Sequence, residues 1–265
     1  DKVERTKMSV AARLVYDERT LDVPVGGSGS RRAIRYRDEA EAVIKVGDGG
    51  VKSALRDQRR LVGVRIDEPT ATLFCPLGSL TREELDLIEI PADSLLLDAL
   101  LPVRPVAEGQ SWPHAKTLLC AMLGLDGASA CEAQSTLSEI NDASAMIDMR
   151  GKVEGAVGGV TTRIELKAKY RFNRKTSRID WFGLAVREDR DIGHVAQGLD
   201  VIARLKMQIE SSKTSPRLAD DAVAELELEP TDAATQLHCA SDKGDWHFVH
   251  DRRWFPVNQD RDMAV

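Results

Sequence analysis

Apolar and polar residues alternate with a period of two along much of the chain. The clearest example is residues 160–172, in which Ile164 and Tyr170 lie on one face and Arg163 lies on the other. Successive side chains of an extended chain point to opposite faces, so this pattern predicts a strand that is buried on one face and solvated on the other. An α-helix cannot satisfy the same pattern, and we therefore expect an antiparallel sheet with one wet face.

The same alternation predicts nine further strands, which are separated by short turns such as Gly158-Gly159. The ten predicted strands are residues 8–16, 33–36, 40–46, 61–66, 70–75, 131–140, 143–157, 160–172, 179–187 and 199–209. Consecutive strands joined by short turns favour a meander. Their length suits a strongly curved sheet better than a compact sandwich.

Three short helices are predicted in the middle of the chain. Thr81 and Glu84 match the capping box, in which the threonine hydroxyl and the glutamate carboxylate each accept a hydrogen bond from a backbone amide at the start of a helix. Pro91 is expected to end this helix, and the other two are expected at residues 93–101 and 113–123. Because the strands have only one apolar face to bury, we expect the helices to cover that face.

The combined pattern predicts an α+β fold, with a large curved antiparallel sheet of about ten strands in meander order covered by about three short mid-chain helices. We expect this sheet and its helical cap to occupy residues 1–212. Residues 213–232 are interpreted as a linker with an acidic segment, and residues 233–265 as the start of an incomplete second, small β-rich domain. Strand-like patterns run up to both ends of the chain, so we expect both to be cut ends.

Composition narrows the class of protein. Hydrophobic residues make up 42% of the chain and charged residues 30%, which is typical of a soluble globular protein. The net charge of −6 argues against a general nucleic-acid-binding protein. No uncharged apolar run approaches the ~18 residues of a membrane-spanning helix, so no transmembrane segment is expected. No motif calls for a cofactor, and the oligomeric state stays open.

The four cysteines are Cys75, Cys120, Cys131 and Cys239, and none of them forms a C-x-x-C pair. A structural zinc site is therefore not expected. Cys120 and Cys131 are the nearest pair, the first on a predicted helix and the second at the start of a predicted strand. They are interpreted either as a disulfide or as two buried apolar thiols, and the sequence leaves both open.

The run from Leu101 to Trp112, LPVRPVAEGQSW, resembles the LPxxPVxxGxSW pattern that begins a strand in exported, β-rich bacterial proteins of uncharacterised function. Gln110 stands where that family usually has aspartate. The order of strands and helices over residues 1–212 is also similar to that of bacterial lipoprotein carriers, in which helices plug a curved sheet that holds acyl chains. The resemblance implies an exported protein of the periplasm or cell envelope.

Histidines are the natural candidates for catalysis or metal binding. His238, His247 and His250 lie near Asp245 and Asp251 in the sequence, and a metal or acid–base site needs several such groups to converge. Alternation around the second and third histidines predicts a strand, on which positions three apart face opposite sides. We therefore expect no metal site, and keep a hydrolase built on these histidines as an alternative. The sequence contains no phosphate-binding loop and no G-x-S-x-G motif.

Charge is distributed unevenly and suggests a binding surface. Residues 160–190 carry nine basic and four acidic side chains, whereas residues 80–100 and 217–232 each carry one basic and six acidic ones. The predicted wet face of one strand holds a basic stripe. Its members are Arg163, Lys167, Lys169 and Arg171. This stripe is expected either to meet an acidic protein or anionic lipid surface, or to be a solvated face that keeps strands from pairing with other chains.

Trp112 and His194 complete the candidate surface. His194 lies in a turn between two long strands, where it is interpreted either as part of the mouth of a pocket or as a hydrogen-bonded turn histidine. We predict a non-catalytic exported binding or assembly protein. It would hold an apolar ligand between sheet and helices, or dock on a partner through its charged face. The alternatives are the hydrolase described above and a structural subunit of a cell-envelope assembly.

Overall fold

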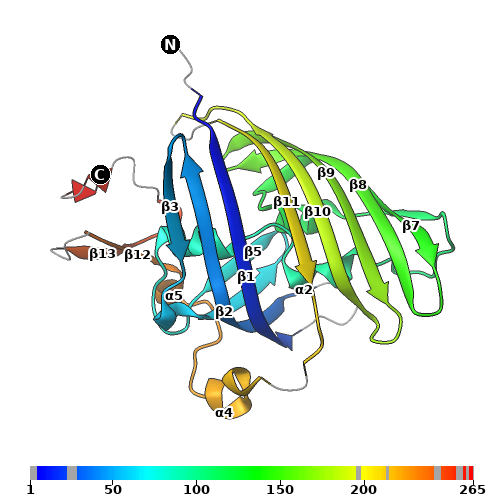
Figure 1. The fold of residues 1–265 in the computed structure, drawn as a ribbon, viewed down its shortest axis with the longest axis horizontal. Helices are drawn as coiled ribbons and strands as arrows, with labels where there is room; N and C mark the ends of the chain where they lie inside the picture. The colour runs from blue at the N-terminus through cyan, green and yellow to red at the C-terminus, as the bar shows by residue number, and fades with distance from the viewer. Residues whose placement is uncertain are drawn as a thin grey trace.

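The computed structural model describes residues 5–22, 29–194, 198–212, 215–241, 246–254, 259–260 and 263–264. Strands account for 54% and helices for 15% of the structure, so the protein is mostly β, with large antiparallel sheets and few short helices. Figure 1 shows the two principal sheets, with helices packed on their inner faces. Among the described residues, no helix is both long and apolar enough to cross a membrane.

The first sheet has five strands, in the order β1-β2-β4-β5. The fifth strand, β3, pairs with the second half of β2, on the same edge that β4 pairs with in the first half. Its strands are β1 (Met8–Asp22), β2 (Arg31–Val46), β3 (Gly49–Ala54), β4 (Leu61–Asp67) and β5 (Thr70–Phe74). The two short strands predicted at residues 33–36 and 40–46 are one long strand. A 3-10 helix at Asp57–Arg59 links β3 to β4.

The second sheet has six strands in the order β11-β10-β9-β8-β7-β6, which is a meander. Its strands are β6 (Ser111–Pro113), β7 (Gly127–Ile140), β8 (Ser144–Val157), β9 (Val160–Asn173), β10 (Arg178–Arg190) and β11 (Leu199–Gln208). All five pairings are antiparallel. The alternation in β9 is observed as predicted, with the apolar residues buried and Arg163 and Lys167 exposed.

The prediction of one large sheet is corrected by this pairing. The meander is interrupted after β5, where the chain forms helices instead of the next strand, and β5 and β6 are not paired. Alternation reports which face of a strand is buried, but it carries no information on which strands pair. The first eleven strands divide between two sheets.

The mid-chain helices are α1 (Arg82–Ile88), α2 (Ser94–Leu97) and α3 (Lys116–Leu123), and a 3-10 helix at Asp98–Leu100 extends the second. The predicted capping box is present at the start of α1: the backbone amide of Glu84 donates to the Thr81 side chain, and the Glu84 carboxylate accepts from the Thr81 amide. The third helix begins later than residue 113, because Pro113 pairs with Gln134 as part of β6.

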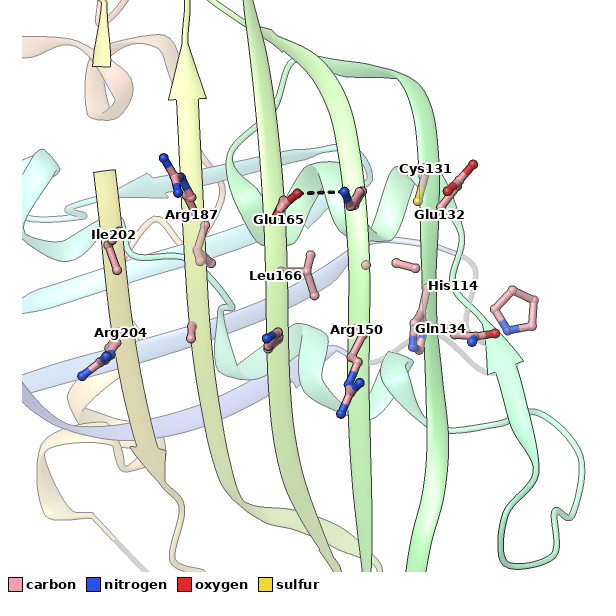
Figure 2. A pocket seen from close by; sticks show the side chains of 17 residues that line it. His114, Cys131, Glu132, Gln134, Arg150, Glu165, Leu166, Arg187, Ile202 and Arg204 are labelled. Carbon is pink, nitrogen blue, oxygen red and sulfur yellow. Dashed lines mark ion pairs between the residues drawn. The ribbon is translucent and has the colours of Figure 1, made fainter. Parts of the chain in front are cut away.

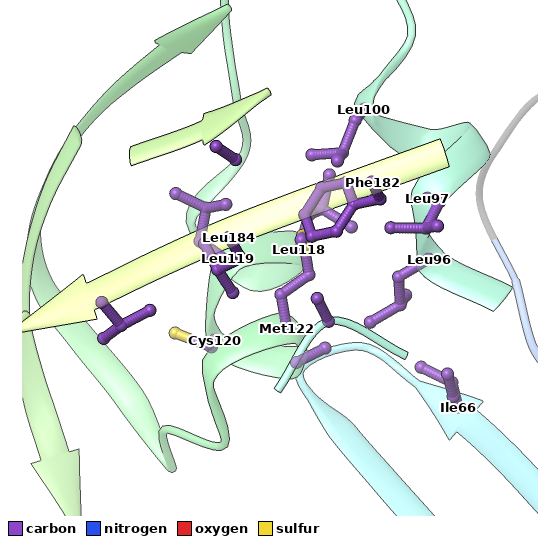
Figure 3. Packing of buried hydrophobic residues seen from close by; sticks show 14 of the residues in the cluster. Ile66, Leu96, Leu97, Leu100, Leu118, Leu119, Cys120, Met122, Phe182 and Leu184 are labelled. Carbon is purple, nitrogen blue, oxygen red and sulfur yellow. The ribbon is translucent and has the colours of Figure 1, made fainter. Parts of the chain in front are cut away.

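The helices and the two sheets share one apolar core. Figure 3 shows Phe182 and Leu184 of β10 close to Leu118, Leu119 and Met122 of α3. These five side chains belong to one buried cluster, which also includes residues of β4, β5 and α2. The prediction that helices cover the apolar face is therefore confirmed. Burial of their apolar side chains in this core explains why short helices of four to eight residues are held in place.

Two arginines are buried on the inner face of β2. Arg35 is 2% exposed and donates two hydrogen bonds to the Asp93 carboxylate, at 2.6 and 2.8 Å, and a third to Glu18. Arg37 is 1% exposed and stacks on the Tyr16 ring, 4.2 Å from its centroid. Burial, and then repulsion from Arg35, lower the pKa of Arg37 to about 10. This cluster fixes the N-terminal end of α2 to the first sheet.

Parts of the segment after β11 contact the first sheet and α1 (Figure 1). Its elements are a 3-10 helix at Pro216–Leu218, α4 (Asp220–Val223), α5 (Asp232–Thr235), β12 (Leu237–Ala240), β13 (His247–His250), β14 (Gln259–Asp260) and β15 (Met263–Ala264). Leu218 and Val223 pack against Ile34 and Leu61 on the outer side of that sheet. Leu237 joins the main core. The boundaries proposed for a linker and a second domain stay predictions.

Candidate binding surface on the six-stranded sheet

The outer face of the six-stranded sheet is polar because its strands alternate in phase. Register aligns one exposed residue from each of five successive strands, β7 to β11, in a line across the sheet. This line, called here the cationic row, consists of Gln134, Arg150, Lys167, Ala185 and Arg204. Arg150 and Lys167 face each other on neighbouring strands, whereas Ala185 separates Lys167 from Arg204.

A second line of exposed residues runs beside the cationic row and lies two residues away from it on each strand. This line, called here the alternating row, consists of Glu132, Lys152, Glu165, Arg187 and Ile202. Lys152 and Glu165 form an ion pair at 2.8 Å. Opposite charges on adjacent strands stabilise their pairing. Ile202, at the end of the row, is 72% exposed.

The two rows line an open hollow of about 830 Å³ on the outer face (Figure 2). Pro113, His114 and Cys131 close it at the β6–β7 end, and Ile202 and Arg204 lie at the β11 end. Figure 2 shows the side chains of Arg150, Glu165 and Arg204 above the strands, with helices behind the sheet. The hollow therefore lies on the solvent side of the sheet and not between sheet and helices.

The cations of the hollow differ in what they contact. Lys152 pairs with Glu165, and Arg187 lies 3.9 Å from Asp200. Arg150, Lys167 and Arg204 form no ion pair or side-chain hydrogen bond with any residue of the described part of the chain. Three exposed cations in one line are thus available to an external anion.

The basic stripe predicted on β9 is only partly available. Arg163 donates to Asp189 at 2.8 Å and to Asp191 at 3.0 Å, and Arg171 donates to Asp180 at 2.7 Å. Lys169 is exposed and lies 3.9 Å from Asp148, while Lys167 lines the hollow. The stripe runs along one strand as predicted. The line of free cations runs across the strands, and finding Arg150 and Arg204 required the register of three further strands.

Trp112 and His194 lie apart from the hollow. Trp112 is half-buried against the core, and its indole Nε1 donates to the backbone oxygen of Leu100 at 2.9 Å. His194 is exposed in a bend after β10. Neither residue is among those that line the hollow. Trp112 therefore anchors the start of the second sheet to the helical segment.

A buried polar chain at the β6–β7 end was not predicted from the sequence. His114 Nε2 lies 2.7 Å from Ser135 Oγ, and the hydroxyl of Tyr170 donates to the same Oγ at 2.8 Å. Ser135 and Tyr170 are both 0% exposed. Burial lowers the pKa of His114 to about 4, so this ring is neutral near pH 7. Because the serine hydroxyl is closed to solvent, the chain ties β6 to β7 and β9 and offers no nucleophile to a substrate.

The three C-terminal histidines do not converge. In the β12–β13 hairpin, His238 faces Val249, which places it on the same side as His247, and their ring centroids are 5.9 Å apart. His250 faces Leu237 on the opposite side. Within the described ranges, no three His, Cys, Asp or Glu side chains are placed to hold a metal ion. Asp245, one of the two expected acidic partners, lies outside the described residues, and the Asp251 carboxylate is bonded to Arg253.

All four cysteines are free thiols. Cys75 and Cys120 are buried, whereas Cys131 and Cys239 are half-buried. Cys120 and Cys131, for which the sequence left a disulfide or two thiols open, are therefore two free thiols. Burial is the main cause that raises the pKa of each, which disfavours the reactive thiolate.

Comparison with known proteins gives no relative: no protein-family model, curated protein or solved structure matches the chain.

Proposed function

We propose that this is a non-catalytic binding protein that docks an acidic protein partner on the outer face of its six-stranded sheet. The carrying observation is the cationic row, in which Arg150, Lys167 and Arg204 stand free along a hollow of about 830 Å³. Free cations in a concave surface attract a partner of complementary charge and fix its orientation. The chain's net charge of −6 makes this basic region a local feature and not a general one.

The charge pattern favours a protein partner over an anionic membrane. Glu132 and Glu165 line the same hollow. Each lies two residues along its strand from a member of the cationic row. A flat anionic bilayer would approach these carboxylates together with the cations and would be repelled by them. A protein segment can place its own carboxylates opposite the cationic row and keep them away from the glutamates.

The packing of the interior disfavours the apolar-ligand version of the prediction. Leu96, Leu100 and Leu119, which lie between the sheets, are each 0% exposed and belong to one continuous cluster. The hydrolase alternative has little support, because the histidines on which it rests lie on two faces of a hairpin. Export to the periplasm or cell envelope stays a prediction from the resemblance alone.

Charge reversal in the hollow tests this proposal. The probe is fluorescently labelled poly-L-glutamate, and the double variant Arg150→Glu/Lys167→Glu is compared with Lys175→Glu, an exposed cation of the β9–β10 turn that lies outside the hollow. We expect the double variant to bind about tenfold more weakly, since each exposed ion pair contributes up to ~1 kcal/mol and reversal adds repulsion. Fluorescence anisotropy at low salt measures the binding.

The Lys175→Glu protein should bind poly-L-glutamate like the original protein. The control reverses one charge and the double variant two, so a loss of binding free energy half as large in the control would mean that only net charge matters. Unchanged binding by the double variant would mean that the hollow is not the site. Either result refutes the proposal. Vesicles of anionic phosphatidylglycerol form a second arm, in which tighter binding than to poly-L-glutamate would identify a lipid surface and overturn the choice of a protein partner.

A further inference from the structure

The direction of the hollow limits the shape of its occupant. Its lining residues come from β6 to β11 in succession, so the hollow crosses the strands. Neighbouring strands are spaced by ~4.8 Å. Arg150 and Lys167 lie on adjacent strands, and Arg204 lies two strands further on. The three free cations therefore span three strand spacings, or ~14 Å between backbones.

An extended peptide matches this span. Its residues rise by ~3.4 Å each, so side chains on the same face recur every ~6.8 Å, and three of them, at alternate positions, span ~13.6 Å. A helix that presents three carboxylates on one face, at intervals of four residues, is ~12 Å long but 10–12 Å wide, which is wider than the ~6.8 Å between the two rows. An extended segment is only ~4.8 Å wide at sheet spacing, so it can lie between the rows.

The two rows of the hollow differ in charge, and an extended peptide lying between them would meet both. Its side chains would point alternately to the cationic row and to the alternating row. Carboxylates pointing to the first would meet Arg150, Lys167 and Arg204. Carboxylates pointing to the second would meet Lys152 and Arg187 as well as Glu132 and Glu165, so their charges cancel and this row offers no net attraction. Acidic residues are thus favoured at every second position.

From this geometry we infer that the hollow recognises an extended acidic segment that crosses the strands, with carboxylates at three alternate positions and uncharged residues between them. This inference rests on the proposed function, because it specifies the partner of the same site. Arg150 and Arg204 bind the outer carboxylates, and Lys167 binds the middle one. Single-stranded nucleic acid is the competing occupant, since its phosphates also repeat along an extended chain.

Two labelled peptides of identical composition test the inference. One has the alternating sequence Ser-Glu-Ser-Glu-Ser-Glu-Ser, and the other has the block sequence Ser-Ser-Glu-Glu-Glu-Ser-Ser. We expect the alternating peptide to bind about fivefold more tightly, because the block peptide reaches about one free cation fewer. Fluorescence anisotropy on the full chain measures both.

Arg204→Gln supplies the matched variant, and Lys175→Gln is its control. Loss of the outer cation should bring the two peptides to within about twofold of each other, whereas the control should keep the full preference. Equal binding of both peptides to the original protein, while poly-L-glutamate still binds at the hollow, refutes the inference and leaves the proposed function standing. Failure of every acidic peptide and of poly-L-glutamate to bind refutes both. Tighter binding of an oligothymidylate than of the alternating peptide identifies nucleic acid and also refutes both.

Discussion

At the scale of single residues, His114 sets part of the response to acid. Burial lowers its pKa from 6.5 to about 4 in the folded protein. As the pH falls below 6.5, the unfolded chain takes up a proton that the folded protein refuses, so the free energy of unfolding decreases. The loss grows until the pH passes the folded pKa and reaches about 3 kcal/mol in all.

The variant His114→Gln isolates this effect. Glutamine can still contact Ser135 but does not titrate, so the difference in unfolding free energy between the two proteins should change between pH 6.5 and pH 4 and be constant above pH 7.5 or so. Urea denaturation at a series of pH values measures this difference. A difference that is flat across the whole range would show that the ring protonates freely in the folded state.

Residues whose partners are near in sequence were predicted correctly, and those with distant partners were missed. Thr81 and Glu84 are three positions apart, and their cap was predicted and is confirmed. Arg35 is buried because Asp93, 58 residues away, meets it. A rule that places arginine on the wet face of a strand cannot include a partner at that distance. Arg150 was not predicted as part of the site because its place beside Lys167 depends on the pairing of two strands.

At the scale of elements, the cap of α1 has a measurable role. The Thr81 side chain accepts the backbone amide of Glu84, which would otherwise be an unsatisfied donor at the helix start. Thr81→Ala should therefore lower the free energy of unfolding by about 1 kcal/mol, while Thr81→Ser should retain most of it. Urea denaturation near pH 7 checks both. If the two variants lose the same amount, the methyl group and not the hydroxyl stabilises the helix.

Alternation identified the strands of this protein but not their partners. It assigned the exposed face of β9 correctly, including Lys167. The cationic row exists only because the turn at Asn141 places Gln134 opposite Arg150 and the turn at Gly158 places Arg150 opposite Lys167. Register depends on turn geometry and on which faces are covered. A line of charges across strands is therefore a property of the assembled sheet.

At the scale of the whole molecule, the segment after residue 212 covers part of the outer face of the first sheet, which the alternation pattern alone predicts to be solvated. Both faces of β2 are covered: Arg35 and Ala42 face the inside, and Ile34 packs against Leu218 on the other side. This explains why the alternation of β2 is less clean than that of β9. It also raises the question of whether the C-terminal segment unfolds together with the rest of the chain or as the separate domain that the sequence predicts.

The variant Leu237→Ala tests whether the chain unfolds as one unit. Leu237 is 1% exposed, belongs to the main core and bridges Leu80, whose backbone oxygen accepts the amide of His238 at 2.7 Å. Leu237→Ala should lower the free energy of unfolding of the entire protein by 2–5 kcal/mol or so, in a single transition. Val249→Ala is the control, because this residue of the same hairpin is 53% exposed and should change stability by less than ~0.5 kcal/mol. Calorimetry that resolves two transitions, with Leu237→Ala moving only one of them, would establish an independent C-terminal domain instead.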